Sequence, residues 1–283
     1  MSKQPIVLGI GEVLWDMLPD GKHCGGATAN VVYHLSKLGI PSAMVSSVGN
    51  DELGKELLSF LISRNISTEY VSSNDFATGV VEVTLNNGIP KYDICQPSAW
   101  DFIELSDKIL QILPEIKCVV FGTLAQRNSV SRETIQTILK SLPNTCLKVF
   151  DINLRQQFYS RELIQESLNF CNVLKINDEE LDTIAKLFEI GESREDVMQK
   201  LFVDYSIDTV ILTLGEKGSV LFDGNNFYEY PVIPCNVVDT VGCGDAFLAG
   251  WCSAILKGMS LGEAMQEGTK RSAMVASQKG AME

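Results

Sequence analysis

Histidine is nearly absent from this chain. Of its 283 residues only two are histidine, His23 and His34. A Ser-His-Asp or Cys-His enzyme would have to use one of them, and a histidine-rich metal site is excluded. Because His34 falls in the helical pattern "ANVVYHLSKLG", we expect it to be structural. The chemistry must therefore rely on carboxylates, backbone amides and a bound cation.

Basic runs and long apolar runs are missing too. The chain has 23 Lys and Arg against 36 Asp and Glu, a formal net charge of −13, which argues against nucleic acid as a partner. No apolar stretch has the length of a membrane span, so we expect no membrane partner. The start of the chain has only a short apolar run, interrupted by an acid, which predicts a first strand rather than a signal peptide.

The eight cysteines show no paired spacing. None forms a CxxC motif, and several lie in strand-like stretches such as "KCVVFG". This pattern is typical of reduced, buried thiols, and we expect a cytoplasmic protein.

What the sequence does contain is an alternation of short apolar strands and amphipathic helices. We expect strands at 5–11, 42–49, 117–122, 147–153, 171–177 and 208–215, and helices at 27–39, 51–65, 131–142, 161–171, 178–188, 193–205, 244–258 and 261–278. The alternation predicts an α/β fold with a mainly parallel sheet covered by helices on both faces. With no linker or repeat, residues 1–283 are expected to form one domain.

Residues 78–95 break this rhythm. The stretch alternates at period two around Asn86-Asn87-Gly88, which predicts a hairpin with Val81, Val83 and Leu85 on one face. An inserted hairpin is either an added sheet edge or a flap, and we favour a flap over the ligand-binding end of the sheet. Its exposed edge would allow two flaps to pair in a homodimer, although the sequence does not fix the oligomeric state.

The stretch "DTVGCGDAFLAGW", residues 239–251, is a glycine-containing loop that leads into an apolar helix. Gly242 and Gly244 carry no side chain to keep a phosphate away, and a helix N-terminus offers free N–H groups with partial positive charge. These amides can stabilise a transferred phosphoryl group, and Asp245 can accept a proton from an attacking hydroxyl. An acid in the first helical turn is also a common stabilising residue, so spacing alone leaves both interpretations open.

This stretch resembles the C-terminal signature of the ribokinase-like carbohydrate kinases, also called the phosphofructokinase-B type. A second signature, at residues 24–54, matches the family at Gly25, Gly26, Asn30, Gly39, Gly49, Asp51 and Gly54. The stretches "GEVLWDMLPDG", "FGTLAQRN", "FDINLRQQFY" and "KINDEEL" are most similar to bacterial fructokinases. The resemblance runs essentially from end to end. It implies a three-layer α/β/α sandwich with a small β lid formed by about 12–20 and 76–97.

The resemblance also implies catalytic roles. Asp245 matches the family's base, and Gly242, Cys243 and Gly244 match its anion hole, with Cys243 where alanine is more common. Arg155 resembles an arginine near the sugar and the phosphate, where a fixed cation can steady transition-state charge.

Sugar binding is implied for a second group of residues. Asp16 matches an acid that hydrogen-bonds sugar hydroxyls, and Gly26 and Asn30 match the sugar-binding segment. Thr28 replaces a proline that is common in this subset of kinases.

A third group is implied to act on the nucleotide and its cations. Asn177 and Glu180 resemble a motif that acts on magnesium and phosphate, partly through water, and Lys175 resembles a residue that lines the phosphates. The Asn177–Glu180 spacing is also that of a capping box, and both roles can hold together. Asp239 resembles a position associated with a monovalent cation such as potassium in some relatives.

The stretch "TLGEKGSV", residues 213–220, resembles the loop where the ribose and phosphates of ATP rest, with Thr213, Gly215 and Gly218 involved. From spacing alone it is as readily an ordinary turn.

The expected function is therefore an ATP-dependent sugar kinase that uses magnesium, with D-fructose to fructose 6-phosphate as the first candidate. Ribose, 2-keto-3-deoxygluconate, a nucleoside or a sugar phosphate are alternative acceptors, and a catalytically silent nucleotide- or sugar-binding regulator is a further alternative. A dinucleotide-dependent oxidoreductase is disfavoured, because Gly9 and Gly11 are not followed by the third glycine of that fingerprint.

Overall fold

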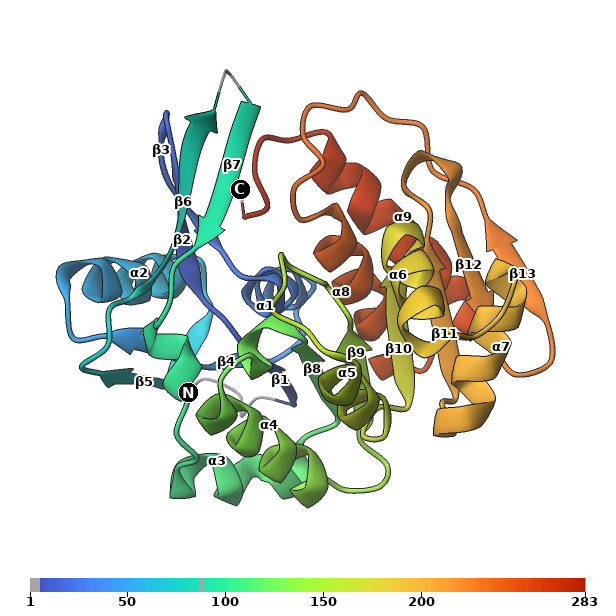
Figure 1. The fold of residues 1–283 in the computed structure, drawn as a ribbon, viewed down its shortest axis with the longest axis horizontal. Helices are drawn as coiled ribbons and strands as arrows, with labels where there is room; N and C mark the ends of the chain where they lie inside the picture. The colour runs from blue at the N-terminus through green and yellow to red at the C-terminus, as the bar shows by residue number, and fades with distance from the viewer. Residues whose placement is uncertain (1–5, 87–88, 283) are drawn as a thin grey trace.

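A nine-stranded sheet forms the centre of the molecule (Figure 1). The computed structural model describes residues 6–86 and 89–282, without the side chains of residues 83–91. The strand order is β13-β12-β11-β10-β9-β8-β1-β4-β5. The bounds are β1 (Val7–Ile10), β4 (Ser42–Gly49), β5 (Ser67–Asn74), β8 (Cys118–Gly122), β9 (Leu147–Asp151), β10 (Val173–Asn177), β11 (Thr209–Thr213), β12 (Ser219–Phe222) and β13 (Phe227–Tyr230).

Most of this sheet is parallel. All neighbours from β11 to β5 pair in parallel, and only the β11–β12 and β12–β13 pairs, at one edge, are antiparallel. The inner strands β1 and β4 are buried along their whole length, as expected for parallel strands covered on both faces. The predicted mainly parallel sheet is confirmed.

Helices cover both faces. One layer contains α1 (Ala27–Lys37), α2 (Glu52–Ser63), α8 (Cys243–Leu256) and α9 (Leu261–Ala276), and the other contains α3 (Asp107–Ile112), α4 (Ser129–Ser141), α5 (Arg161–Leu168), α6 (Asp178–Phe188) and α7 (Arg194–Tyr205). Leu35 of α1 and Trp251 of α8 belong to the apolar core on the first face, and Ile135 of α4 and Ile184 of α6 to the core on the second. The three-layer arrangement is therefore as predicted.

A second, four-stranded sheet stands at one end of the molecule, at the upper left of Figure 1. Its order is β3-β2-β6-β7, with bounds β2 (Leu14–Leu18), β3 (Gly21–Gly25), β6 (Gly79–Asn86) and β7 (Ile89–Ile94). Two antiparallel hairpins, β2–β3 and β6–β7, are joined by a parallel β2–β6 pair.

The hairpin predicted at 78–95 is thus confirmed by its strand pairing. Its turn at Asn87-Gly88 and the side chains of Val83 and Leu85 lie outside the described residues, whereas Val81 is buried. The sequence pattern did not predict β3, β5, β12, β13 or α3. Strands β12 and β13 have only four residues each, and β5 has eight residues but only one that is buried.

The cysteine prediction needs a partial correction. Cys118, Cys146, Cys171 and Cys252 are buried, but Cys235 is exposed. Within residues 6–86 and 89–282 all the cysteines are free thiols. Cys235 is exposed because the segment between β13 and α8 lies on the surface.

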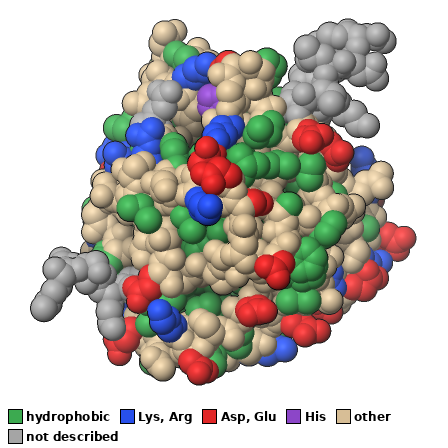
Figure 2. Space-filling view, turned by 90° about the vertical axis from the view of Figure 1, so that its left-hand side faces the viewer, with side chains coloured by type: hydrophobic (Ala, Val, Ile, Leu, Met, Phe, Trp, Pro, Cys, Tyr) green, Lys and Arg blue, Asp and Glu red, His purple; other side chains and the backbone are tan. Residues whose placement is uncertain are grey.

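On the face shown in Figure 2, Lys and Arg side chains are interspersed with Asp, Glu and apolar side chains. In the described part of the chain, no helix is both long enough and apolar enough to cross a bilayer.

Candidate active site

The candidate site lies where the parallel strands end and α8 begins. Asp151 is the last residue of β9, Lys175 lies near the end of β10, and Glu12 follows β1. Since parallel strands present their carboxyl ends at one edge, these residues from distant parts of the chain are brought together there.

Asp245, in the first turn of α8, is held by α1. The side-chain amide Nδ2 of Asn30 donates a hydrogen bond of 2.7 Å to Oδ2 of Asp245. Burial, reinforced by the charge of Asp151, raises the pKa of Asp245 to about 6, although Lys175, Asn30 and Arg155 act to lower it. A carboxylate that titrates near neutral pH is suited to accept and release a proton.

The backbone at the N-terminus of α8, around Gly242 and Gly244, lies beside Asp245 and is called the cradle below. The N-cap residue Gly242 has a φ of 76°, and no side chain caps the helix. A Cβ atom at Gly242 would lie 2.4 Å from the Cβ of Ala281, so a larger residue does not fit. Within the described chain, the N–H groups of Gly244 and Asp245 have no hydrogen-bond acceptor. Free N–H groups at a helix start are a ready site for an anion.

Lys175 brings a positive charge to this cradle. A Cβ atom at Gly244 would lie 3.2 Å from the Nζ of Lys175. The Nζ atom donates to both carboxylate oxygens of Asp151, at 2.9 and 3.1 Å, and both side chains are buried. Burial alone would lower the pKa of Lys175, but Asp151, Glu180 and Asp245 raise it above its usual value. Lys175 therefore keeps its charge although it is buried.

Arg155 lies close enough to three carboxyl groups for its charge to act on them. It is exposed, and its charge lowers the pKa values of Glu12, Asp16 and Asp245. For Glu12 and Asp16 burial is the larger effect and raises the pKa. The structure thus gathers Arg155, Asp16 and Asp245 into one site.

Glu12 and Asp151 were not singled out from the sequence. Glu12 is 3% exposed and accepts a hydrogen bond of 3.1 Å from the N–H of Ala27 at the start of α1. Gly26, the N-cap of α1, has a φ of 114°, and a Cβ atom there would lie 2.3 Å from the carbonyl oxygen of Glu12. The sequence signal that could have identified both residues is an acid at the end of a buried parallel strand, as for Asp151, or two residues after it, as for Glu12.

Asn177 and Glu180 form the capping box that their spacing predicted. The N–H of Glu180 donates to Oδ1 of Asn177 at 2.8 Å, and the N–H of Asn177 donates to Oε2 of Glu180 at 2.9 Å. Oε1 of Glu180 also accepts from the N–H of Leu154 at 2.9 Å. The capping role is therefore confirmed, and it fixes the Glu180 carboxylate at the end of β10.

The described residues contain no group of three or more His, Cys, Asp and Glu side chains placed to hold a metal ion. Magnesium usually keeps several waters and binds through one or two carboxylates together with substrate phosphates. Both oxygens of the fixed Glu180 carboxylate already accept a backbone N–H, and a magnesium role for Glu180, through water, stays a prediction.

Asp239 shapes the loop before α8. Its Oδ1 accepts from the N–H of Val241 at 3.0 Å, and its Oδ2 accepts from the N–H of Gly280 at 2.9 Å. These hydrogen bonds lower the pKa of Asp239, against the effect of burial. A cation role for Asp239 stays a prediction.

The turn after β11 lies beside Asn177. Thr213 is paired in register with Asn177, and Gly215 and Gly218 have φ values of 56° and 100°. The N–H of Leu214 donates to the carbonyl of Gly218 at 2.8 Å, which closes a tight turn. The turn interpretation is correct, and nucleotide contact by this turn stays a prediction.

Comparison with known proteins identifies the family of this chain. The profile of the pfkB family carbohydrate kinases matches residues 20–283. The ATP-dependent 6-phosphofructokinase of Thermoanaerobacterium thermosaccharolyticum is 30% identical over 94% of this chain and 86% of its own length. The fructokinase of Escherichia coli is 27% identical over 89% of this chain and 83% of its own length.

The fold also matches solved structures. An uncharacterised sugar kinase of Pyrococcus horikoshii superposes with a TM-score of 0.84 at 29% identity, over 98% of this chain and 93% of that one. The matched profile spans both signatures, the ends of β9 and β10 and the start of α8. The chain therefore belongs to the pfkB family of carbohydrate kinases and has the ribokinase-like fold.

Proposed function

We propose that this protein transfers the terminal phosphoryl group of ATP to a primary hydroxyl of a sugar, with D-fructose as the first candidate acceptor. The observation that carries the proposal is the Asp245 carboxylate at the uncapped start of α8, held by Asn30 at 2.7 Å. A base and an anion cradle lie within one helical turn, which is what in-line phosphoryl transfer requires.

In the proposed reaction Asp245 removes the proton from the attacking hydroxyl. The hydroxyl oxygen forms a bond to the terminal phosphorus while the bond from that phosphorus to the bridging oxygen of ADP breaks. The free N–H groups of Gly244 and Asp245 and the charge of Lys175 stabilise the negative charge on the transferred group. Arg155 supports this from the acceptor side.

The nucleotide is expected to lie along the ends of β10 and β11, over Lys175, Asn177 and the Thr213–Gly218 turn. Glu180 would hold magnesium through water, and the ion when bound would neutralise charge on the phosphates. A potassium ion near Asp239 is a further prediction of the resemblance.

The charged groups around the proposed sugar-binding part of the site favour a neutral sugar as the acceptor. Glu12, Asp16 and Asp245 are three carboxyl groups that share the nearby cation Arg155, and Asp245 also lies near Lys175. Carboxylates bind hydroxyl groups well and repel a phosphate. Asp16 and Asn30 are proposed to hold the remaining sugar hydroxyls.

Fructose 6-phosphate is the second candidate acceptor. It is supported by the name of the 30% identical relative and by the exposed guanidinium of Arg155, which can pair with a phosphate. The two candidates differ in the role of Arg155, which would either bind the phosphate of the acceptor sugar or stabilise the charge on the transferred phosphoryl group.

The small sheet is proposed to act as a lid. The Nε2 atom of Gln156, in the loop that carries Arg155, donates to the carbonyl of Tyr92 in β7 at 2.8 Å. This hydrogen bond joins the small sheet to the loop that carries Arg155. A closed lid would exclude water, which competes with the sugar as a nucleophile.

The test is release of ADP by the purified protein with ATP and magnesium and, in separate reactions, D-fructose, fructose 6-phosphate, ribose or 2-keto-3-deoxygluconate. We expect the highest kcat/KM with D-fructose. A preference for fructose 6-phosphate would select the second candidate. No release above the Asp245→Asn variant with any acceptor would favour a silent binding protein.

A further inference from the structure

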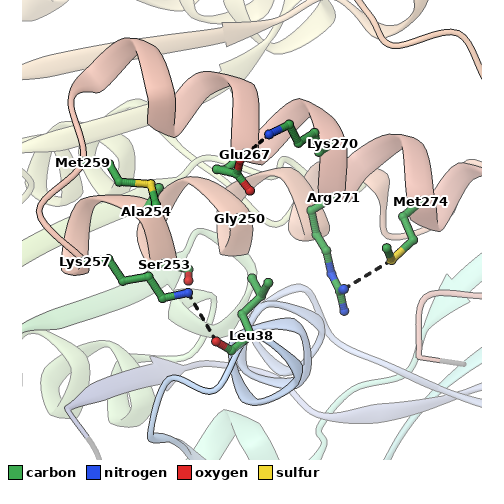
Figure 3. Close-up of a pocket in the computed structure, with 10 residues that line it drawn as sticks. All are labelled: Leu38, Gly250, Ser253, Ala254, Lys257, Met259, Glu267, Lys270, Arg271 and Met274. Carbon is green, nitrogen blue, oxygen red and sulfur yellow. Dashed lines mark hydrogen bonds and ion pairs between the residues drawn. The ribbon is translucent and has the colours of Figure 1, made fainter.

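Two arginines away from the proposed chemistry differ in what they join. Arg271 lines a hollow of about 240 Å³ between α8, α9 and the end of α1, where Figure 3 shows it beside Met274. Its Nη2 atom lies 3.0 Å from Nδ1 of His34 and its Nη1 atom 3.3 Å from the sulfur of Met274, so it joins α9 to α1. Arg127 is more deeply buried, and it contacts three segments, one of which carries Arg155.

A buried ion pair fixes the side chain of Arg127. The residue lies in "FGTLAQRN", residues 121–128, which has no role in the proposed reaction. Its Nε and Nη2 atoms donate to the two carboxylate oxygens of Asp101 at 2.7 and 2.8 Å, and the two side chains are 5% and 3% exposed. A pair of parallel hydrogen bonds sets the plane of the guanidinium as well as its position. The remaining donors and the faces of the group therefore have fixed directions.

The β6–β7 hairpin of the small sheet is anchored on this group at both ends. Nη2 of Arg127 also donates to the carbonyl of Cys95 at 2.8 Å, one residue after the end of β7. The guanidinium carbon lies over the ring of Trp100, 4.0 Å from its centroid. A Cβ atom at Gly79, the first residue of β6, would lie 2.3 Å from Nε1 of Trp100. The hairpin therefore enters and leaves the small sheet against Arg127 and Trp100.

The loop that carries Arg155 contacts the same guanidinium. Its carbon lies 4.6 Å from the centroid of the Phe158 ring, and the N–H of Phe158 donates to the carbonyl of Arg155 at 3.1 Å. Asn153 and Gln156, on either side of Arg155, have φ values of 43° and 48°. Residues other than glycine rarely adopt this left-handed region, so surrounding contacts must keep the loop in this shape.

We propose that Arg127 is a positioning residue for the acceptor side of the reaction. By joining the Phe158 ring to the end of β7, it fixes the place of the Arg155 guanidinium relative to the bound sugar. The inference rests on the proposed function, in which Arg155 acts on the sugar or on the transferred phosphoryl group. A displacement of about 1 Å at such a group can lower the rate by about a hundredfold, even when its cause lies away from the chemistry.

The variant Phe158→Leu tests this role without breaking the buried ion pair. It removes the ring over Arg127 and leaves Asp101 paired, so the protein is expected to fold. We expect kcat/KM for the acceptor sugar to fall about tenfold, with the KM for ATP unchanged. The matched control is Phe170→Leu, which removes another half-buried ring that packs on the same core and lies under Lys140 at 5.5 Å. This control is expected to keep full kcat/KM.

A double variant separates positioning from a general loss of structure. If Phe158 acts through Arg155, its replacement costs nothing further once the guanidinium of Arg155 is gone. The variant Phe158→Leu with Arg155→Ala should then have the kcat/KM of Arg155→Ala alone. The proposal is overturned if the two losses multiply, or if Phe158→Leu is as active as Phe170→Leu.

Tryptic cleavage after Arg155 gives a readout that does not depend on activity. Arg155 is exposed, and a loosened loop should be cut faster at this bond in Phe158→Leu and in Arg127→Lys than in Phe170→Leu, as measured by mass spectrometry. Arg127→Lys keeps a charge beside Asp101 but loses the planar group. Failure to release ADP with any acceptor would count against the proposed function, and the cleavage rates would still decide the positioning role. Equal cleavage in all three variants would overturn it.

Discussion

The side-chain amide of Asn30 donates a 2.7 Å hydrogen bond to the carboxylate of Asp245, across 215 residues of sequence. This bond joins the start of α1 to the start of α8, and so joins the proposed sugar-binding segment to the proposed base. It also orients Asp245, whose pKa depends on burial and on its charged neighbours.

Replacing Asp245 by Asn is expected to lower kcat by about 10²–10⁴-fold, because the amide cannot accept the proton of the sugar hydroxyl. The Kd for ATP should change little, since the cradle N–H groups belong to the backbone. Steady-state kinetics and a direct nucleotide-binding titration measure the two quantities. Near-normal turnover of this variant would refute the assignment of the base.

The pH dependence of kcat/KM should follow the ionisation of Asp245, whose pKa is raised to about 6. A base must be deprotonated to act, so activity is expected to rise with pH through 6 and to be about tenfold lower at pH 5 than at pH 8. The Asp151→Asn variant, which removes the charge of Asp151, should shift this rise of kcat/KM to lower pH. A profile flat between pH 5 and 8 would contradict the prediction.

Arg155→Ala is expected to reduce kcat/KM for the sugar by about 10-fold to 10³-fold, because a fixed cation beside Asp16 and Asp245 is lost. The matched control is Arg194→Ala, which removes a surface arginine paired with Glu195 and Glu229. Arg155 has no role in the site if both variants keep full activity.

The buried pair Lys175–Asp151 should show strong coupling in stability. Lys175→Met leaves Asp151 buried without its partner and near Glu180 and Asp245, so it should lower the free energy of unfolding by about 3–5 kcal/mol. The double variant Lys175→Met with Asp151→Leu should recover much of this loss. Urea unfolding of the four proteins gives the coupling energy, and strictly additive losses would disprove the coupling.

Cys243→Ala should leave kcat within about threefold of the unmodified value. Only the backbone at this position is proposed to contact the phosphoryl group, and the thiol contacts the carbonyl of Asp239 at 3.9 Å and the side chain of Ser272. Cys243→Val is the contrasting variant, because a β-branched side chain is bulky at the helix start. A large loss with alanine would show that the thiol itself takes part.

Local chemistry explains which parts of the fold were predictable. The capping box of Asn177 and Glu180 involves residues three apart, so the sequence contains the whole of it. The helix over 178–188 and the hairpin strands around Val81 were likewise visible as periodic patterns. Strands β12 and β13 are four residues each, too short for a pattern to stand out from a loop.

The sequence by itself determined the α/β alternation, the glycine loop that ends in Asp245, and the family signatures, because each depends on spacing within a few residues. The tertiary structure decided that Glu12, Arg155 and Asp151 gather around Asp245, and that Arg271 meets His34 instead of a carboxylate. The reason is physical: a pKa or an uncompensated charge depends on burial and on charges from distant segments, and only the packed chain sets their distances.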